Sequence, residues 1–274
     1  MAKSKSQIGR WTLFIVHFSL LIFLAACTPP DGTWNQVLET GTLRVGMDAS
    51  FPPFEAIGAD GTLVGFDVDL ARELGQRLGV EVQFVANLSY DGLYDALAVD
   101  LVDVVISALV VDSVRMADFA YSAHYFDAGQ VLVVCSPEDG EDTIEEMADL
   151  RGLTLAVEFG TQGDLEARKW ARRLPGLAIV SCQTAAEALT AVAEGDADGA
   201  LVDHVSALAA TGVGSGLIIV EKSVIEEPYA VAVRRESRYL LRAINDALAE
   251  MEADGTIDAL VAKWLARPET GQNR

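Results

Sequence analysis

Patterns typical of strands alternate with patterns typical of helices along almost the whole chain, and this alternation limits the possible folds most strongly. At residues 43–47, apolar side chains alternate with other side chains, as in a half-buried strand. From Phe66 to Leu78 an apolar side chain recurs every fourth residue, which is typical of a helix on a core, and Gly79 is placed to end it. Such alternation predicts an α/β fold with largely parallel sheets.

The same patterns continue to residue 265 without a repeat of fixed period. Strands are expected at residues 43–47, 80–84, 102–106, 131–134, 153–157, 177–180, 200–202, 217–220 and 229–233. Helices are expected at residues 66–78, 93–98, 143–150, 164–174, 184–194, 237–254 and 257–265.

Composition narrows the class of protein further. The chain has 274 residues, of which 51% are hydrophobic and 22% charged, and it is therefore too apolar to be a disordered chain. Only one apolar run approaches the length of a membrane span, which excludes a protein with many spans. The formal net charge of −21 argues against nucleic acid as a partner, because phosphate binding needs clustered Lys and Arg.

The N-terminus has the pattern of an export signal. Lys3, Lys5 and Arg10 precede an apolar run over residues 11–26, and small residues stand directly before Cys27. A basic start, an apolar core and small residues at a cut site predict a signal peptide over residues 1–26. The alternative is a short membrane anchor, but the run is shorter than the roughly 20 residues of a spanning helix. Residues 27–34 are expected to form a Pro- and Gly-containing tether.

The cysteines point to export rather than to a metal site. Cys27 after Leu-Ala-Ala resembles the lipobox of bacterial lipoproteins, in which this Cys carries the lipid. Cys135 and Cys182 then remain, and they could form a disulfide, which an exported chain permits, or stay as two buried thiols. No Cys-x-x-Cys motif or His-rich cluster is present, so we expect neither a metal nor another cofactor.

Polar residues follow several expected strands, and ligands of open α/β sheets bind where strands end. These residues fall into two sets, one in each half of the chain, which indicates a cleft between two lobes: 48–55, 107–115, 158–164 and Asp203. Residues 160–163 link a strand to a helix, so their amides and the helix dipole could bind an anion, although an ordinary tight turn would look the same. An Arg beside such a site would bind a carboxylate through two charge-assisted bonds, and Asp203 an ammonium.

These motifs, taken in order, resemble the family 3 solute-binding proteins of amino-acid ABC importers. The resemblance covers residues 35–267 and is carried by Gly65-Phe66-Asp67-Val68-Asp69-Leu70-Ala71, Tyr90-Asp91-Gly92-Leu93, Arg115, Phe119-Ala120-Tyr121-Ser122, Gly160-Thr161, Ala253-Asp254-Gly255-Thr256 and Lys263-Trp264. It implies a two-lobe type II periplasmic-binding-protein fold with two hinge strands near 129–134 and 228–233. Lobe 1 would comprise 35–131 plus 230–268, and lobe 2 would comprise 132–229.

The resemblance also implies a ligand site in the cleft between the lobes. Arg115 would bind an α-carboxylate with the Thr161 and Gln162 amides, Asp203 would bind the α-ammonium, Phe51 and Tyr90 would sandwich the ligand, and Asp48 would meet its side chain. Each role has a structural alternative: a surface charge for Arg115, a core position for Phe51, a helix start for Tyr90 and an N-cap for Asp203. Asp67 and Asp69 are expected to cap a helix and lie in solvent.

Two positions bear on the choice of ligand. Members of this family that bind a free α-amino group usually carry Ser or Thr where this chain has Val110. The Ala108 carbonyl and Asp203 would then have to suffice, or the ligand nitrogen is substituted, as in compatible solutes. Glu158, together with Asp48, would favour a cationic side chain, although Glu158 could equally point to solvent.

The resulting hypothesis is a monomeric, exported, lipid-anchored receptor on the outer face of the cell membrane. It would capture a polar amino acid and deliver it to an ABC permease, without catalysis and without nucleic acid. One alternative is a binder of a cyclic or N-substituted amino acid. Another is a dehydratase of cyclic acids, for which Glu158 is the one candidate general acid, and a third is a sensor or adhesin domain.

Overall fold

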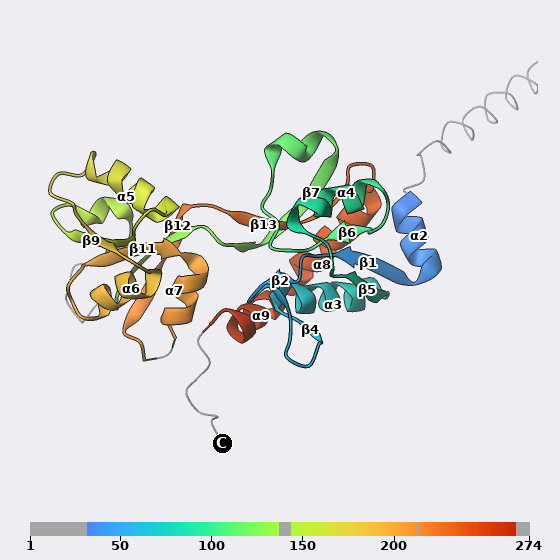
Figure 1. Cartoon of the computed structure of the whole chain (residues 1–274), viewed down its shortest axis with the longest axis horizontal. Helices are drawn as coiled ribbons and strands as arrows, with labels where there is room; N and C mark the ends of the chain where they lie inside the picture. The colour runs from blue at the N-terminus through green and yellow to red at the C-terminus, as the bar shows by residue number, and fades with distance from the viewer. Residues whose placement is uncertain (1–31, 137–143, 213, 267–274) are drawn as a thin grey trace, which may run out of the picture.

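The computed structural model describes residues 32–136, 144–212 and 214–266, and the expected signal segment and Cys27 lie outside these ranges. Two five-stranded sheets form two lobes that lie side by side (Figure 1). We call lobe 1 the part built on the first sheet and lobe 2 the part built on the second. This arrangement confirms the expected two-lobe α/β fold.

The sheet of lobe 1 has the strand order β5-β1-β6-β13-β7. Strand β1 (Thr42–Gly46) pairs in parallel with β5 (Glu81–Val85) and β6 (Val104–Val105). Strand β13 (Pro228–Arg234) runs antiparallel to both β6 and β7 (Phe119–Asp127). A small separate sheet is formed by β2 (Ser50–Phe51), β3 (Glu55–Ile57) and β4 (Leu63–Val64).

The sheet of lobe 2 has the order β10-β9-β11-β8-β12. Strand β9 (Thr154–Glu158) is parallel to β10 (Ala178–Cys182) and β11 (Gly199–Asp203). Strand β8 (Gln130–Cys135) is antiparallel to β11 and β12 (Leu217–Ile225). Each sheet is therefore mixed, with four strands in one direction, and the strand that directly follows a crossing between the lobes, β13 or β8, runs in the opposite direction.

Helices cover both faces of each sheet. Lobe 1 carries α2 (Gly32–Thr40), α3 (Phe66–Leu78), α4 (Leu93–Ala98), α8 (Arg238–Ala253) and α9 (Thr256–Trp264), and lobe 2 carries α5 (Gln162–Ala171), α6 (Ala185–Ala193) and α7 (His204–Ala210). Alternate residues of one strand enter different cores: Val131 and Val133 of β8 face one cluster, whereas Leu132 and Val134 face another. Burial of both strand faces explains why the strand patterns read as nearly continuous apolar runs.

Some elements differ from the sequence-based expectation. Helix α2 includes residues 32–34 of the expected tether, because the Thr33 hydroxyl bonds Ser237 Oγ at 2.8 Å and packs on the lobe. Within the expected helix at 143–150, the structure forms a short 3₁₀ helix at Met147–Leu150, and Thr143 lies outside the described residues. Strand β7 was not expected from the sequence, and it pairs with β13 with register shifts.

The chain crosses between the lobes at residues 128–129 and 226–227 (Figure 1). The crossings thus end at residues 129 and 227, two residues before the boundaries that the resemblance implies, after 131 and after 229. The Asp127 carboxylate ties the crossings together, since it accepts from Gly129 N at 2.9 Å, Glu227 N at 2.7 Å and Ser223 Oγ at 2.7 Å. A Cβ on Gly129 would lie 1.8 Å from Ile225 O, so the close approach of the crossings requires glycine.

Two further predictions concern the cysteines and the membrane. Cys135 and Cys182 are both free thiols, and the Cys135 Sγ donates to Val192 O at 3.2 Å. In the described part of the chain, no helix combines the length and apolar character that a membrane span requires.

Candidate functional site

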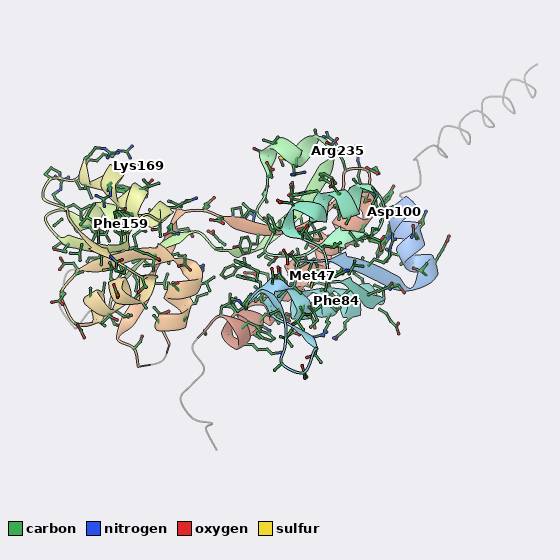
Figure 2. The ribbon with its side chains drawn as sticks, viewed as in Figure 1. Met47, Phe84, Asp100, Phe159, Lys169 and Arg235 are labelled. Atoms are coloured by element: carbon green, nitrogen blue, oxygen red, sulfur yellow. The ribbon has the colours of Figure 1, made fainter. Side chains whose placement is uncertain are left out.

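The first part of the site is the loop that follows β1. Met47, the residue after β1, is completely buried and lies near the middle of lobe 1 in the view of Figure 2. The next residue, Asp48, accepts from Ser50 Oγ at 2.7 Å and from Tyr90 N at 2.9 Å through its carboxylate. Its own amide donates to Ser107 Oγ at 3.0 Å. Asp48 therefore joins the ends of three segments of lobe 1 at one place.

Two aromatic rings lie exposed beside this loop. Phe51 is 50% exposed and stacks on the buried Phe54 at a centroid distance of 5.8 Å, so Phe54 occupies the core position and Phe51 does not. Tyr90 is 47% exposed and forms a hydrogen bond with the backbone of Val110. Partial burial raises the pKa of Tyr90, so its hydroxyl remains protonated at neutral pH. Both rings can contact a ligand outside the core.

Arg115 lies in a short 3₁₀ helix, Ser113–Ala117, on lobe 1. Its guanidinium stands over the Tyr94 ring at 4.2 Å, and its Nε is 3.5 Å from Asp112 Oδ2. Asp112 also caps the 3₁₀ helix by accepting from Val114 N at 2.8 Å. The Arg115 side chain keeps 44% of its surface exposed, so the ring orients the guanidinium while leaving it accessible to an anion.

Ala108 and Val110 lie on a segment that runs beside the crossing strand β13. Ala230 N donates to Leu109 O at 3.0 Å, and Val110 forms an isolated bridge with Tyr229. Ala108 is buried and has a φ of +43°, a left-handed conformation that favours glycine. Its amide donates to Asp67 Oδ2 at 2.5 Å, and this bond holds the unusual backbone in place.

In lobe 2 the corresponding residues surround the N-terminus of α5. Thr161 is the N-cap, and its hydroxyl donates to Glu158 O at 2.8 Å and accepts from Asp164 N at 3.3 Å. Gln162 is exposed in the first turn, where backbone amides have no partner within the helix. A Cβ on Gly163 would lie 2.9 Å from Leu201 O, so this turn packs tightly against β11. The N-terminus of a ten-residue helix is suited to an anion.

The other lobe 2 residues are Glu158 and Asp203. Glu158 is the last residue of β9, and its side chain has no hydrogen bond or ion pair with the described residues. The next residue, Phe159, is exposed on lobe 2 (Figure 2). Asp203 is the N-cap of α7 and accepts from Ser206 N at 2.8 Å. The structure thus shows Asp203 as an N-cap. Its binding to an ammonium group stays a prediction. His204, the next residue, bonds Asp127 O at 2.7 Å through Nδ1, next to the crossings.

The expectation for Asp67 is wrong, whereas Asp69 is an ion-paired surface residue. Asp69 Oδ2 bonds Lys263 Nζ at 2.6 Å and Trp264 Nε1 at 2.9 Å, and this lowers the pKa of Asp69. Asp67 is completely buried beside Glu55, which sequence reasoning missed. The available signal was that Asp67 stands between apolar residues at the start of the buried face of α3, not on the face that solvent covers.

The structure therefore brings the predicted residues together as two separate sets. Lobe 1 carries Asp48, Phe51, Tyr90, Ala108, Val110 and Arg115, and lobe 2 carries Glu158, Thr161, Gln162 and Asp203. Among the described residues, no hydrogen bond or ion pair joins the two sets. A cavity of about 230 Å³ lies elsewhere in lobe 2, is lined by residues such as Met147, Trp170 and Val220, and contains none of them. The described ranges also contain no group of three or more potential metal ligands.

The sequence from residue 43 to residue 267 matches the profile of bacterial extracellular solute-binding proteins, family 3. The chain belongs to this family. The L-cystine-binding protein TcyJ of Escherichia coli K12 is 32% identical over 243 residues, which cover 88% of each chain. The histidine-binding periplasmic protein of the same strain is 32% identical over 260 residues, which cover 92% of this chain and 96% of that protein.

Solved structures that are similar to this chain have the same two-lobe fold. The ancestral cationic amino acid solute-binding protein AncCDT-1 is 33% identical, with a TM-score of 0.60, over 85% of this chain and all of that one. The relatives named here are binding proteins. Family 3 membership therefore gives the two-lobe architecture a function class, whereas the ligand must be inferred from the residues.

Proposed function

We propose that this family 3 protein is the substrate-binding component of an ABC importer and captures a polar amino acid between its lobes. One observation carries the proposal: each lobe presents a group suited to the same carboxylate. Arg115 lies oriented and accessible on lobe 1, and the Thr161-capped N-terminus of α5 lies on lobe 2. An α-carboxylate that binds both groups would join the lobes.

The α-ammonium of the ligand would bind between Ala108 O and the Asp203 carboxylate. The left-handed backbone of Ala108 distinguishes this carbonyl from those of an extended segment. Asp203 keeps a second carboxylate oxygen beyond the one that caps α7. Val110 offers no hydroxyl at the position where relatives of this family usually have one, so these two acceptors carry the interaction, or the ligand nitrogen is substituted.

The side chain of the ligand would be cationic. Asp48 and Glu158 add negative charge on lobe 1 and lobe 2, and the described site residues include one cation, Arg115, which is committed to the carboxylate. The exposed rings of Phe51 and Tyr90 suit a guanidinium or ammonium, which is attracted to aromatic faces. The similarity to an ancestral cationic amino acid-binding protein supports this choice.

Transport requires no chemistry from this protein, and we assign it no catalytic step. A ligand that contacts both lobes favours the closed arrangement by the difference between its affinities for the closed and open states. The two crossings tied by Asp127 form the hinge about which the lobes would close. A permease that binds the closed form would then receive the amino acid.

The cellular context follows from residues outside the described ranges. Residues 1–26 would direct export, and lipid on Cys27 would hold the monomer on the outer face of the membrane. This lipid would keep the receptor close to its permease. Metabolic labelling with a radioactive fatty acid tests the anchor, because wild type should be labelled and Cys27→Ala should not.

A thermal-shift panel on the purified protein tests the ligand assignment. The panel contains L-arginine, L-lysine, L-ornithine, L-histidine, L-cystine, L-glutamate and a quaternary ammonium compatible solute. A ligand at about 100 times its Kd stabilises the folded protein by about 2.7 kcal/mol, so the cationic amino acids should raise the Tm most. A response to the compatible solute alone would replace this ligand class. Turnover of a cyclic acid would instead show that the protein is a dehydratase.

A further inference from the structure

Two carboxyl groups lie against each other in the interior of lobe 1. Glu55 of β3 is 1% exposed, Asp67 of α3 is fully buried, and their side chains are hydrogen-bonded to each other. Glu55 Oε2 and Asp67 Oδ1 receive no hydrogen from any donor group of the described chain. Two ionised carboxylates in a buried contact would repel, so one proton between them satisfies both orphan oxygens.

The remaining bonds show which acid holds that proton. Asp67 Oδ2 accepts from Ala108 N at 2.5 Å and from Tyr125 OH at 3.0 Å. Glu55 Oε1 accepts a single bond, from Ser107 Oγ at 2.7 Å. Because hydrogen bonds stabilise the charged form of an acceptor, the negative charge is favoured on Asp67 and the proton on Glu55.

Among the described residues, the groups found to shift the pKa values of the pair include no cation. The titratable groups near it are Asp48 after β1, Tyr90 of the 3₁₀ helix Tyr90–Gly92, Tyr125 of β7 and Tyr229 of β13. Burial and the charge of Asp67 raise the pKa of Glu55 to about 10, whereas burial raises the pKa of Asp67 to about 6. A proton, and not a salt bridge, therefore neutralises the second acid.

Hydrogen bonds link the pair to two of the three segments of lobe 1 that carry predicted ligand contacts, the loop after β1 and the segment of Ala108. Asp67 holds the amide of Ala108, whose left-handed conformation would otherwise be unfavourable. Glu55 holds the Ser107 hydroxyl, which in turn accepts from the amide of Asp48 at 3.0 Å. A change in the charge or geometry of the pair therefore reaches Ala108 directly and Asp48 through Ser107.

We propose that Glu55 and Asp67 share one proton and act as a positioning pair, which fixes Ala108 and Asp48 for the ligand and keeps one negative charge beneath the ammonium position. This role rests on the proposed amino-acid site, whereas the shared proton does not. The pair adds to the proposed function. Its negative charge lies below the site and would attract a cation, whereas Val110 has no hydroxyl that could do so.

Infrared spectroscopy of the ligand-free protein tests the shared proton. At about pH 8 ordinary carboxyl groups are ionised, so wild type should show the carbonyl stretch of one protonated carboxylic acid. Glu55→Gln preserves shape and hydrogen bonding but should abolish this band. The proposal is overturned if wild type lacks the band, or if Glu55→Gln retains it. Wild type alone decides the first outcome, even where a variant fails to fold.

Calorimetry with L-arginine tests the positioning role. Glu55→Gln keeps the charge of the pair and should bind within about threefold of wild type, whereas Asp67→Asn loses the charge and should bind about tenfold more weakly. The affinity of wild type should fall as the pH decreases through about 6, when a second proton enters the pair, and this dependence should be absent in Asp67→Asn. Equal affinities of the two variants, or a pH dependence that Asp67→Asn retains, would contradict the role. A third outcome separates the two claims: wild type does not bind L-arginine, but the infrared band behaves as expected. In that case the shared proton stands. The assignment of a cationic ligand fails, and the positioning role for that ligand is refuted.

Discussion

The two lobes have the same sheet plan but bury different kinds of side chain. In each sheet four strands run in one direction and one, β13 or β8, runs in the opposite direction. In the described residues, lobe 1 buries the polar side chains of Thr33, Glu55, Asp67, Asp103, Ser107, Ser122 and Ser237, whereas lobe 2 buries those of Gln130 and Asp164. One architecture therefore accommodates more buried polar side chains in one apolar lobe interior than in the other.

The aromatic residues show the same difference. In lobe 1 the buried Phe54 lies against the rings of Phe51, Phe66, Phe126 and Tyr229, at centroid distances from 5.2 to 5.9 Å. The two clusters of lobe 2 are instead built mostly from Ala, Val and Leu. A rigid aromatic base holds the exposed Phe51 ring in place, so lobe 1 is suited to shape recognition.

This difference indicates which part of the proposed ligand binding each lobe would perform. Lobe 1 presents side chains on a fixed polar and aromatic base, and its specificity would depend on residue identity. Lobe 2 presents the N-termini of helices capped by Thr161 and Asp203, which any sequence with suitable caps could supply. Substitutions in lobe 1 should therefore alter the choice of ligand, whereas those in lobe 2 should alter affinity.

Arg115→Ala should have the largest effect, because it removes the cation of lobe 1 that would bind the carboxylate. Loss of this partner should weaken binding of the best ligand in the panel by about 3 kcal/mol, which is more than about 100-fold. Calorimetry measures the change. Arg172→Ala, which removes an exposed arginine of lobe 2, is the control and should bind normally. Unchanged affinity of Arg115→Ala would exclude it from the site.

Gly65→Ala compares the tolerance of the two lobes to an added methyl group. A Cβ on Gly65 would lie 2.0 Å from Phe54 O, at a φ of +138°, so the start of α3 and the base beneath Phe51 must shift. We expect a loss of about 3 kcal/mol in the free energy of unfolding. Gly152→Ala in lobe 2 has a φ of +79° but open space around the new Cβ, and it should cost about 1 kcal/mol. If denaturant unfolding shows that the two variants lose the same free energy of unfolding, lobe 1 does not tolerate an added methyl group less well than lobe 2.

Glu55→Gln should change how stability depends on pH, because lobe 1 holds this acid in its protonated form. Its pKa is raised from 4.5 to about 10 on folding, so its contribution to stability is fully present below about pH 4.5 and is lost as the pH rises toward 10. The unfolding free energy of wild type should therefore fall more steeply than that of the variant as the pH rises above about 5. Parallel curves in denaturant titrations would contradict a protonated Glu55.

Helices and strands were predicted best where one hydrophobic pattern in the sequence indicated both which residues are buried and how long the element is. The helix expected at 93–98 is found as α4, and α3 ends as expected before Gly79, which adopts the left-handed conformation. Strand β7 was missed because its side chains are polar at Ser122 and His124 although its backbone is paired along β13. Backbone pairing with a distant strand leaves no periodic signal in the residues themselves.

The site shows a similar division. Asp48, Glu158 and Asp203 could be proposed from their positions at or after strand ends, since the end of a strand is a local property of the sequence. The Glu55–Asp67 pair could not, because its burial arises only when α3 packs against β3 and the segment that contains Ser107. The stacking of Arg115 on Tyr94 likewise depends on tertiary packing.

Thr161→Ala is expected to have the smallest effect and separates capping from binding within lobe 2. Thr161 caps α5 and Thr184 caps α6 in the same way, through a hydroxyl that accepts from Asp164 N or Glu187 N. Each substitution by Ala should lower the free energy of unfolding by about 1 kcal/mol, measured by denaturant titration. Only Thr161→Ala should also weaken ligand binding, by about threefold, because only the first turn of α5 would contact the carboxylate. If Thr184→Ala weakens binding equally, the effect comes from general destabilisation of lobe 2, and the anion site would have to be placed on lobe 1 alone.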